Sequence, residues 1–480
     1  MPTLTDAELA VFRQGIASIT GEAERRRAPV EWVNGRLGEY LYAKQREIAQ
    51  SVQDNRRTAV AACFDSGKSF LASRLALWWV ETHPPGEALV VSTATTAHQV
   101  RAILWQEMGA AHERHGLLGE MRQTEWKIGT RLVGFGRRPR DWSPDALTGH
   151  HRPYVLVIVD ESSGVPRVIF EALEGLITNE DSRILAIGNP YAPDSHFARI
   201  CRPGSIWKTF HISAFDTPAW TGEAVPDVAR RSLLSKLWVS ELQEMLGAEY
   251  EASAMWQTKV LGQFPEEGDD QLISLAAVIR AQLHEVPKET NHPTIGVDVA
   301  RYGEDETVIA ARWGWHFEII DSFRRKPTTY TAGRVIHWVK ELTSRDVRID
   351  DDGIGGGVTD MVREAGVTVD ALRNGATPSD PSRFVDARSE WWWHLRQAFH
   401  DFECDIPDDD TLQAQLTSPK FTTDSKGRIK VESKKDMRKR GVPSPDRADA
   451  LMFTTASSRT VAPVVAPVSV PQTSYHRSML

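Results

Sequence analysis

Three features are scarce in this sequence, and each scarcity excludes a class of protein. The 480 residues contain three cysteines, Cys63, Cys201 and Cys404. Their spacing excludes a disulfide framework and a cysteine zinc site, and it fits a reducing compartment. No apolar run approaches the roughly 20 residues of a membrane span, and residues 1–17 lack the apolar core of a signal peptide. The formal net charge of −8 excludes a uniformly basic surface, so contact with nucleic acid requires local basic clusters.

The length favours at least two hydrophobic cores. Short β-rich runs alternate with helical stretches in the first half, which predicts a parallel sheet covered by helices, with strands at 58–63, 88–93, 155–159 and 183–187. After a mainly helical stretch, β character returns as a three-stranded meander at 294–299, 307–312 and 317–322, followed by a helix at 332–343 and a strand at 347–350. We predict an α/β chain with domains at 1–210 and 286–460, a hinge subdomain at 211–285 and a loose tail at 461–480.

A phosphate-binding motif follows the first predicted strand. The run from Ala62 to Ser69 reads Ala-Cys-Phe-Asp-Ser-Gly-Lys-Ser and matches the P-loop pattern, with Ala62 in place of the first glycine. In such a loop backbone N–H groups cradle phosphate, the lysine reaches the β- and γ-phosphates, and the following hydroxyl binds Mg²⁺. A coincidental turn is the alternative. The predicted nucleotide-binding residues of the loop are Asp65, Ser66, Gly67, Lys68 and Ser69.

A second motif supports the first. Five apolar residues end at Asp160-Glu161, where one carboxylate would bind Mg²⁺ and the next would activate the water that attacks the γ-phosphate. The alternative is a strand that ends in a solvated acidic turn. Such a coincidence is common for one motif but does not readily explain a P-loop and an acidic strand end in this order. Gln45 is a candidate for binding adenine and Asn189 for sensing the γ-phosphate, the alternatives being a solvated helix residue and a simple turn. The sequence predicts a Mg²⁺-dependent ATPase.

Spaced aspartates in the second half indicate another metal site. Cleavage of a phosphodiester by two metals requires carboxylates that hold two cations about 4 Å apart. Single aspartates are more often helix caps or surface charges, but here they follow a strand, strand, helix order. Asp298 is predicted in mid-strand, Asp350 at a strand end, and Asp446 and Asp449 on one face of a helix with Ser444 as its cap. These residues predict a site for two Mg²⁺ or Mn²⁺ ions.

Two further clusters lie near these aspartates. Residues 420–440 form the most basic stretch, predicted as a β-hairpin that grips backbone phosphates, with a solvated loop as the alternative. Trp391, Trp392 and Trp393 are predicted to pack in a core on an amphipathic helix rather than to stack on bases.

The ordered motifs resemble those of the large terminase subunit of tailed bacteriophages, over roughly residues 42–455. The resemblance rests on the P-loop, the aspartate motifs and the segments 42–45, 92–100, 147–151, 159–165, 188–190 and 262–265. It implies that Lys68 and Ser69 are the Walker A residues, Asp160 the magnesium ligand, Glu161 the catalytic base and Asn189 part of a coupling motif. It also implies an RNase H-like nuclease domain whose metals are carried by Asp298, Asp350 and one of Asp446 and Asp449, with Asp446 favoured.

The same resemblance implies a function and a set of partners. ATP hydrolysis would drive double-stranded DNA into a procapsid, and the nuclease would cut the concatemeric genome at the start and end of packaging. The expected partners are a portal protein, a small terminase subunit and further copies of the chain in a pentameric ring, in the host cytoplasm and transiently on the procapsid. A helicase-like or repair ATPase with an attached nuclease is one alternative, and a motor with a catalytically silent C-terminal clamp is another.

The chain departs from the family at one position. Many members carry an arginine inside the P-loop, about where Phe64 stands here. A transition-state arginine must then come from elsewhere, from a neighbouring subunit or from Arg137, Arg138 or Arg140. A basic loop on DNA or in solvent is an equal explanation for these three arginines.

Overall fold

The computed structural model describes residues 28–84, 86–137, 152–266, 270–300, 305–401 and 403–456. Predictions for Arg138, Arg140, the motif at 147–151 and the tail lie outside these residues. The chain divides into two compact units. The first is Met1–Glu285 with Asp408–Lys420 and Glu432–Pro445, and the second is Val286–Pro407, Phe421–Val431 and Asp446–Leu480. The segment 211–285, predicted as a hinge, belongs to the first unit by its contacts; its mechanical role stays a prediction.

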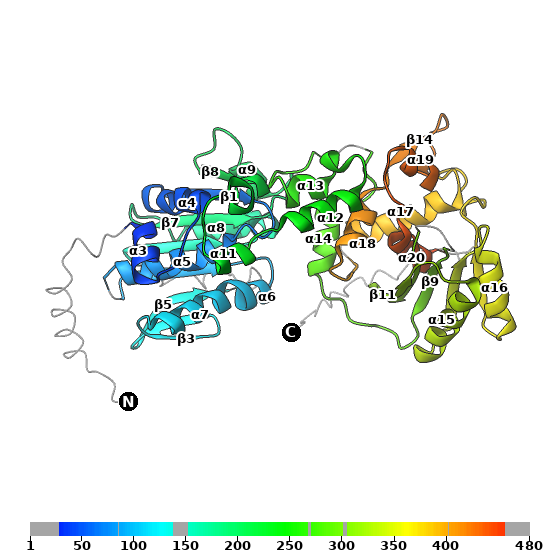
Figure 1. Ribbon diagram of the computed structural model, residues 1–480, viewed down its shortest axis with the longest axis horizontal. Helices are drawn as coiled ribbons and strands as arrows, with labels where there is room; N and C mark the ends of the chain where they lie inside the picture. The colour runs from blue at the N-terminus through cyan, green and yellow to red at the C-terminus, as the bar shows by residue number, and fades with distance from the viewer. Residues whose placement is uncertain are drawn as a thin grey trace, which may run out of the picture. The chain divides into compact units, whose positions relative to one another are not determined.

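An eight-stranded sheet forms the centre of the first unit (Figure 1), in the order β3-β4-β5-β2-β6-β7-β1-β8. Its strands are β1 Arg57–Ala62, β2 Ala88–Thr93, β3 Glu120–Arg122, β4 Glu125–Ile128, β5 Arg131–Gly136, β6 Tyr154–Val159, β7 Arg183–Gly188 and β8 Lys208–Ile212. The pairs that join β5, β2, β6, β7, β1 and β8 are parallel, which confirms the predicted parallel-rich sheet. The antiparallel β3–β4–β5 edge and the edge strand β8 were not predicted.

The helices of the first unit connect and cover these strands. They are α3 Pro29–Arg36, α4 Ala43–Asp54, α5 Lys68–Thr82, α6 Ala97–Gln99, α7 Gln106–His115, α8 Arg167–Glu174, α9 His196–Ile200, α10 Pro218–Thr221, α11 Asp227–Arg231, α12 Lys236–Leu246, α13 Ala254–Lys259, α14 Leu275–Leu283, α18 Asp410–Thr417 and α19 Lys434–Lys439.

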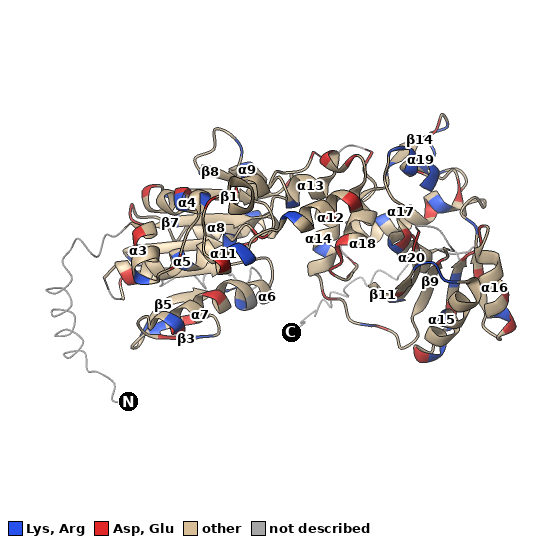
Figure 2. Cartoon of the chain, viewed as in Figure 1, with Lys and Arg blue, Asp and Glu red and all other residues tan. Residues whose placement is uncertain are grey.

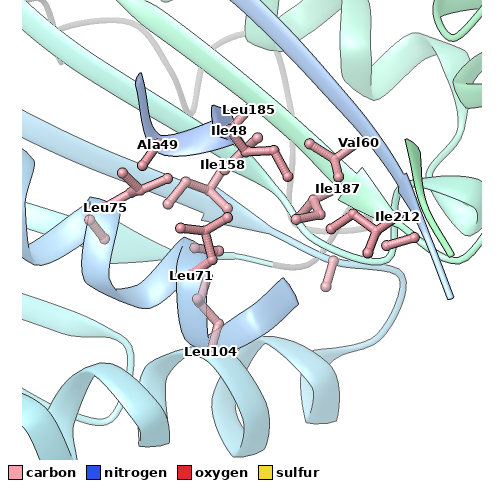
Figure 3. Packing of buried hydrophobic residues seen from close by; sticks show 14 of the residues in the cluster. Ile48, Ala49, Val60, Leu71, Leu75, Leu104, Ile158, Leu185, Ile187 and Ile212 are labelled. Atoms are coloured by element: carbon pink, nitrogen blue, oxygen red, sulfur yellow. The ribbon is translucent and has the colours of Figure 1, made fainter. Parts of the chain in front are cut away.

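Alternate side chains of the central strands enter two apolar cores, one on each face of the sheet. Val60 and Ile158 pack with Leu71 and Leu75 of α5 and with Ile48 of α4 (Figure 3). The remaining strand positions pack on the opposite face with residues of α8 and α9. Burial on both faces explains the continuous apolar runs of these strands, because a parallel sheet between helix layers has no solvated face.

The second unit contains a smaller mixed sheet in the order β11-β10-β9-β12-β13. Its strands are β9 Thr294–Asp298, β10 Thr307–Trp313, β11 His316–Phe323, β12 Asp346–Asp350 and β13 Val369–Leu372, and a separate hairpin is formed by β14 Phe421–Thr423 and β15 Ile429–Val431. Its helices are α15 Thr328–Glu341, α16 Gly355–Glu364, α17 Ala387–His400 and α20 Asp446–Thr455. The predicted antiparallel meander is confirmed as β9, β10 and β11.

Two helices pack on one face of this second sheet and a third packs on the other. Ile295 and Val297 of β9 share an apolar cluster with residues of α15 and α16. On the opposite face, a Cβ on Gly296 would lie 2.4 Å from the carbonyl oxygen of Ala450, so α20 lies directly on the backbone of β9. Trp391 and Trp392 of α17 are buried, as predicted for core residues, whereas Trp393 is half-buried and packs against Phe421. In the described parts of both units, no helix has the length and apolar character needed to cross a membrane.

Candidate functional site

The loop between β1 and α5 has the backbone of a phosphate cradle. Asp65 and Gly67 have φ values of 43° and 73°, and α5 begins at Lys68, so the N–H groups of its first turn face the loop. A Cβ at position 67 would lie 2.6 Å from Nε2 of Gln45. The positive φ favours glycine at position 67, and a larger residue there would also displace the end of the Gln45 side chain.

Four of the predicted nucleotide-site residues meet beside this loop. The ammonium of Lys68 lies 3.4 Å from Oε1 of Glu161, and the hydroxyl of Ser69 donates to Oδ2 of Asp160 at 3.5 Å. Asp160 and Glu161 follow β6, and the loop follows β1. Only β7 separates these two parallel strands, so both segments lie at the same carboxyl edge of the sheet.

The electrostatics of the cluster suit a bound cation and phosphate. Burial, and next the charge of Glu161, raise the pKa of Asp160 to about 7. Burial alone would lower the pKa of Lys68, but the charges of Glu161 and Asp160 outweigh it and the pKa is raised. A desolvated carboxylate beside a hydroxyl oxygen fits Mg²⁺, which prefers hard oxygen ligands.

Gln45 and Asn189 both contact the backbone of the loop. Nε2 of Gln45 donates to the carbonyl oxygen of Gly67 at 3.1 Å, and its Oε1 accepts from the backbone N–H of Tyr42 at 3.2 Å. Nδ2 of Asn189 donates to the carbonyl oxygen of Ala62 at 2.7 Å. The structure therefore brings both residues to the loop, and their contacts with nucleotide stay predictions.

The second group of aspartates lies at the carboxyl ends of β9 and β12. These strands are parallel neighbours, with Ile349 opposite Val297, so the residues that follow, Asp350 and Asp298, stand side by side on adjacent strands. Adjacent strands lie about 4.8 Å apart. Asp298 is the last residue of β9 and not a mid-strand residue as predicted, because β9 ends where the chain turns toward β10.

Helix α20 brings a third carboxylate to this edge. It begins at Asp446, later than the predicted start with Ser444 as cap and Pro445 as first residue. Oδ2 of Asp446 accepts from the backbone N–H of Glu306 at 2.7 Å. Asp449 is one turn further along, where its Oδ1 accepts from Nε1 of Trp392 at 3.0 Å and lies 3.4 Å from Nη2 of Arg388. The two aspartates thus have different surroundings, although the sequence could not separate them.

Asn374, which sequence reasoning missed, connects two of the acids. Its Nδ2 donates to Oδ1 of Asp350 at 3.3 Å and to Oδ2 of Asp352 at 3.0 Å. Its own Oδ1 is buried and has no hydrogen-bond partner among the described residues. An all-oxygen donor set with a buried amide oxygen fits a hard cation. Within the described residues, however, no three acidic, histidine or cysteine side chains already surround one point, so the ligand set stays a prediction.

The basic stretch at 420–440 is only partly a hairpin. Residues 421–431 form the β14–β15 hairpin, whereas Lys434 and Lys435 begin α19, on which lysine and arginine gather (Figure 2). Arg440 pairs with Glu432 at 2.7 Å and with Glu249 at 2.9 Å. The prediction of one continuous basic hairpin was therefore wrong, because the run ends in a helix and intramolecular pairs neutralise part of its charge.

Comparison with known proteins identifies the relationship. The chain is 25% identical to a probable terminase large subunit of Enterobacteria phage P7, over 451 residues that cover 85% of this chain and 87% of the relative. The chain is a homologue of a phage large terminase subunit. This confirms the resemblance predicted from the motifs. No model of a known protein family matches the chain.

Solved structures similar to this terminase homologue include two terminases. A large terminase from the thermophilic bacteriophage D6E, in complex with ADP, covers 87% of this chain and 98% of its own, with 12% identity and a TM-score of 0.41. The nuclease domain of the large terminase subunit gp2 of bacterial virus Sf6 covers 39% of this chain and 99% of its own, with 19% identity and a TM-score of 0.36.

The terminase homologue places two lysines around Phe64, the residue that departs from the family pattern. The ammonium of Lys68 lies 5.9 Å from the centre of the Phe64 ring, and that of Lys259 lies 4.6 Å from it. Lys259 was not predicted from the sequence, because a lysine within a helical stretch is usually solvated. Arg137, a predicted arginine candidate, lies over the ring of Phe135 at 5.3 Å.

Proposed function

We propose that this chain is the large subunit of a phage terminase, in which ATP hydrolysis drives DNA translocation and a metal-dependent endonuclease cuts the genome. The observation that carries the proposal is the meeting of Lys68, Ser69, Asp160 and Glu161 at one sheet edge, in a chain related to a terminase over 85% of its length. The aspartate pair on β9 and β12 supports the nuclease part.

The Lys68–Glu161 pair suggests how hydrolysis is gated. The ammonium of Lys68 lies 3.4 Å from the Glu161 carboxylate. The γ-phosphate of ATP attracts the same ammonium more strongly because it carries more charge. Binding of ATP therefore releases Glu161, whose carboxylate can accept a proton from the attacking water. Ser69 and Asp160 would hold Mg²⁺, which would neutralise part of the charge of the phosphates.

At the second centre, Asp298, Asp350 and Asp446 are the proposed metal-holding residues. Mg²⁺ or Mn²⁺ there would activate a water and stabilise the leaving oxygen of a phosphodiester. We assign Asp449 a supporting role, because Trp392 and Arg388 already bind its Oδ1. Asn374 holds Asp350 in place through its amide nitrogen.

The proposed partners follow from this function. They are double-stranded DNA, a portal protein, a small terminase subunit and further copies of the chain in a pentameric ring. The proposed location is the host cytoplasm, with transient docking on the procapsid. The residues of α19 and of the β14–β15 hairpin are the proposed DNA contacts.

The ATPase assignment is tested with Glu161→Gln. The amide cannot accept the proton, so steady-state ATP turnover should fall by a factor on the order of 10² to 10⁴, while the affinity for a fluorescent ATP analogue stays near that of the original chain. Glu171→Gln is the matched control, because Glu171 is exposed and pairs with Arg167 on the surface. Undiminished turnover in Glu161→Gln removes Glu161 from the mechanism.

The nuclease assignment is tested separately with Asp298→Asn. Linearisation of supercoiled plasmid with Mn²⁺ should be lost while ATP turnover persists, and the exposed Asp360→Asn should retain both activities. Cleavage by Asp298→Asn at the original rate would show that Asp298 holds no metal. Absence of cleavage in the original chain, with intact ATP turnover, would favour a catalytically silent clamp.

A further inference from the structure

The last turn of α13 contacts the nucleotide loop. The backbone N–H of Phe64 donates to the carbonyl oxygen of Lys259 at 3.0 Å. Just beyond the helix, a Cβ on Gly262 would lie 2.8 Å from the backbone nitrogen of Cys63 and 2.3 Å from the carbonyl oxygen of Ile212. The loop and this segment are therefore in direct backbone contact.

The same turn also contacts the predicted coupling motif. The hydroxyl of Thr258 donates to the carbonyl oxygen of Pro190 at 3.2 Å. Pro190 follows Asn189, whose side chain binds Ala62 at the start of the loop. Two independent contacts thus connect residues 258–259 with groups that would respond to the γ-phosphate.

The side chain of Lys259 extends this connection to another element. Lys259 is only 2% exposed. Its ammonium forms an ion pair with Asp410, the first residue of α18. Burial lowers the pKa of Lys259, and the charge of Asp410 partly offsets this. A buried ammonium requires an anionic partner because removal of its charge from water is unfavourable. The pair therefore binds α18 to the nucleotide side of the unit.

The position of α18 makes this pair informative. The helix packs against α14 and α12, and Ala414 belongs to the apolar core of the first unit. In sequence, however, it lies between α17 and β14, both of which belong to the second unit. Lys259 therefore joins the nucleotide loop to a helix of the first unit whose flanking segments in the sequence belong to the second unit.

We propose that Lys259 is a positioning residue that couples the nucleotide state of the Phe64 loop to α18 through its ion pair with Asp410. This inference rests on the proposed ATPase function and extends it. When phosphate enters the loop, Lys68 is drawn away from Glu161 and the Phe64 ring, flanked by both lysines, shifts. Lys259 transfers that shift to the first turn of α18.

Hydrogen exchange of the full chain tests the proposal. Amide exchange at residues 410–417 is measured with and without a slowly hydrolysed ATP analogue and Mg²⁺. In the original chain the analogue should change exchange in α18 at least threefold. In Lys259→Met this change should disappear, with analogue affinity altered less than threefold and kcat for ATP lowered about tenfold at an unchanged KM. Lys259→Arg, which can keep the pair, should restore the response.

The exposed Lys208→Met is the control and should behave as the original chain. An unaltered α18 response in Lys259→Met overturns the proposal, as does a chain that binds the analogue without any change at α18. If Lys259→Met does not fold, Asp410→Asn changes the pair from its half-exposed side and should give the same loss. A chain that binds no nucleotide refutes the proposed function itself, a result that the affinity measurement separates from failure of the coupling.

Discussion

Gly188 lies against the backbone of the proposed catalytic base, Glu161, and of the residue that follows it. A Cβ at this position would lie 2.7 Å from the backbone nitrogen of Ser162 and 3.3 Å from the Cα of Glu161. Both obstacles are backbone atoms, which cannot move aside as a flexible side chain can. A side chain on this last residue of β7 would therefore displace the backbone of Glu161.

We predict that Gly188→Ala lowers kcat for ATP by a factor on the order of 10², because a displacement near 1 Å at a catalytic group has such an effect. Nucleotide affinity should be largely kept, since Gly67 and Lys68 lie on another strand–helix connection. Gly109→Ala is the control, because a Cβ there meets none of the described residues within 4 Å. Normal turnover in Gly188→Ala would mean that the Glu161 backbone tolerates the displacement.

His83 offers a prediction about pH. Its ring lies between those of Trp79 and Tyr154, at 4.3 and 4.4 Å, and burial lowers its pKa below the ordinary 6.5. As the pH falls through about 6.5, the unfolded chain binds this proton before the folded chain does, so the free energy of unfolding decreases. Urea unfolding at pH 8 and pH 5.5 should show a smaller pH difference in His83→Gln than in the original chain. The exposed His98→Gln should show the original difference, and equal differences in all three would exclude His83 as a cause.

Residues with one dominant chemical reason were predictable from the sequence. Lys68, Ser69, Asp160 and Glu161 belong to motifs that combine a strand end with a helix start, and the structure brings them together as expected. The environments of Asp446 and Asp449 could not be told apart, because their difference lies in Trp392 and Arg388 from a distant helix. Lys259 could not be found either, since its partner Asp410 is 151 residues away.

Helices and strands were predictable where the pattern of apolar residues was strong. They were missed where pairing with neighbouring strands, and not their own sequence, determines the structure. β2 was predicted at the bounds that the structure has, because its apolar run is buried on both faces. The short strands β3 and β4 were missed, since their exposed side chains carry little periodic signal. The strand β8 was missed because most of its residues are exposed on the sheet edge.

Two helices contain glycines that the fold does not require. Gly109 lies inside α7 in the first unit and Gly333 inside α15 in the second. In the part of the chain that the structure describes, a Cβ at either position meets no other atom within 4 Å. Alanine should stabilise each helix by about 0.5–1 kcal/mol, because glycine loses more backbone freedom on folding. Thermal unfolding followed separately by loss of ATP turnover and of nuclease activity should show Gly109→Ala protecting the first and Gly333→Ala the second. Equal protection of both activities by either variant would show that the units unfold together.

The two units are interleaved along the chain, which the sequence did not reveal. The longest segment of the first unit ends at Glu285, but 408–420 and 432–445 return to this unit. The order of the motifs predicts which strands and helices carry the sites. It does not show in which unit's hydrophobic core a short helix packs. α18 joins the first core through Ala414 and through the partner of one buried lysine.

This interleaving predicts that Lys259→Met changes the free energy of unfolding differently in the full chain and in a shortened chain. In the full chain Lys259→Met removes a buried charge and leaves Asp410, whose side chain is 39% exposed, free to hydrate. The effect on the free energy of unfolding should therefore stay within about 1 kcal/mol. In a fragment ending at residue 285 the ammonium of Lys259 has lost Asp410 altogether. The same substitution should then stabilise the fragment by on the order of 2 kcal/mol, because it removes an uncompensated buried charge.

Urea unfolding of the four proteins, with soluble yield as a second measure, gives the comparison, and Lys208→Met in both lengths controls for the loss of a positive charge. The fragment should also be less stable than the full chain, because the cavity left by α18 exposes apolar residues of α12 and α14 to water. If Lys259→Met destabilises the fragment and the full chain alike, this explanation is wrong. Asp410 would then not be the residue that stabilises the buried ammonium of Lys259.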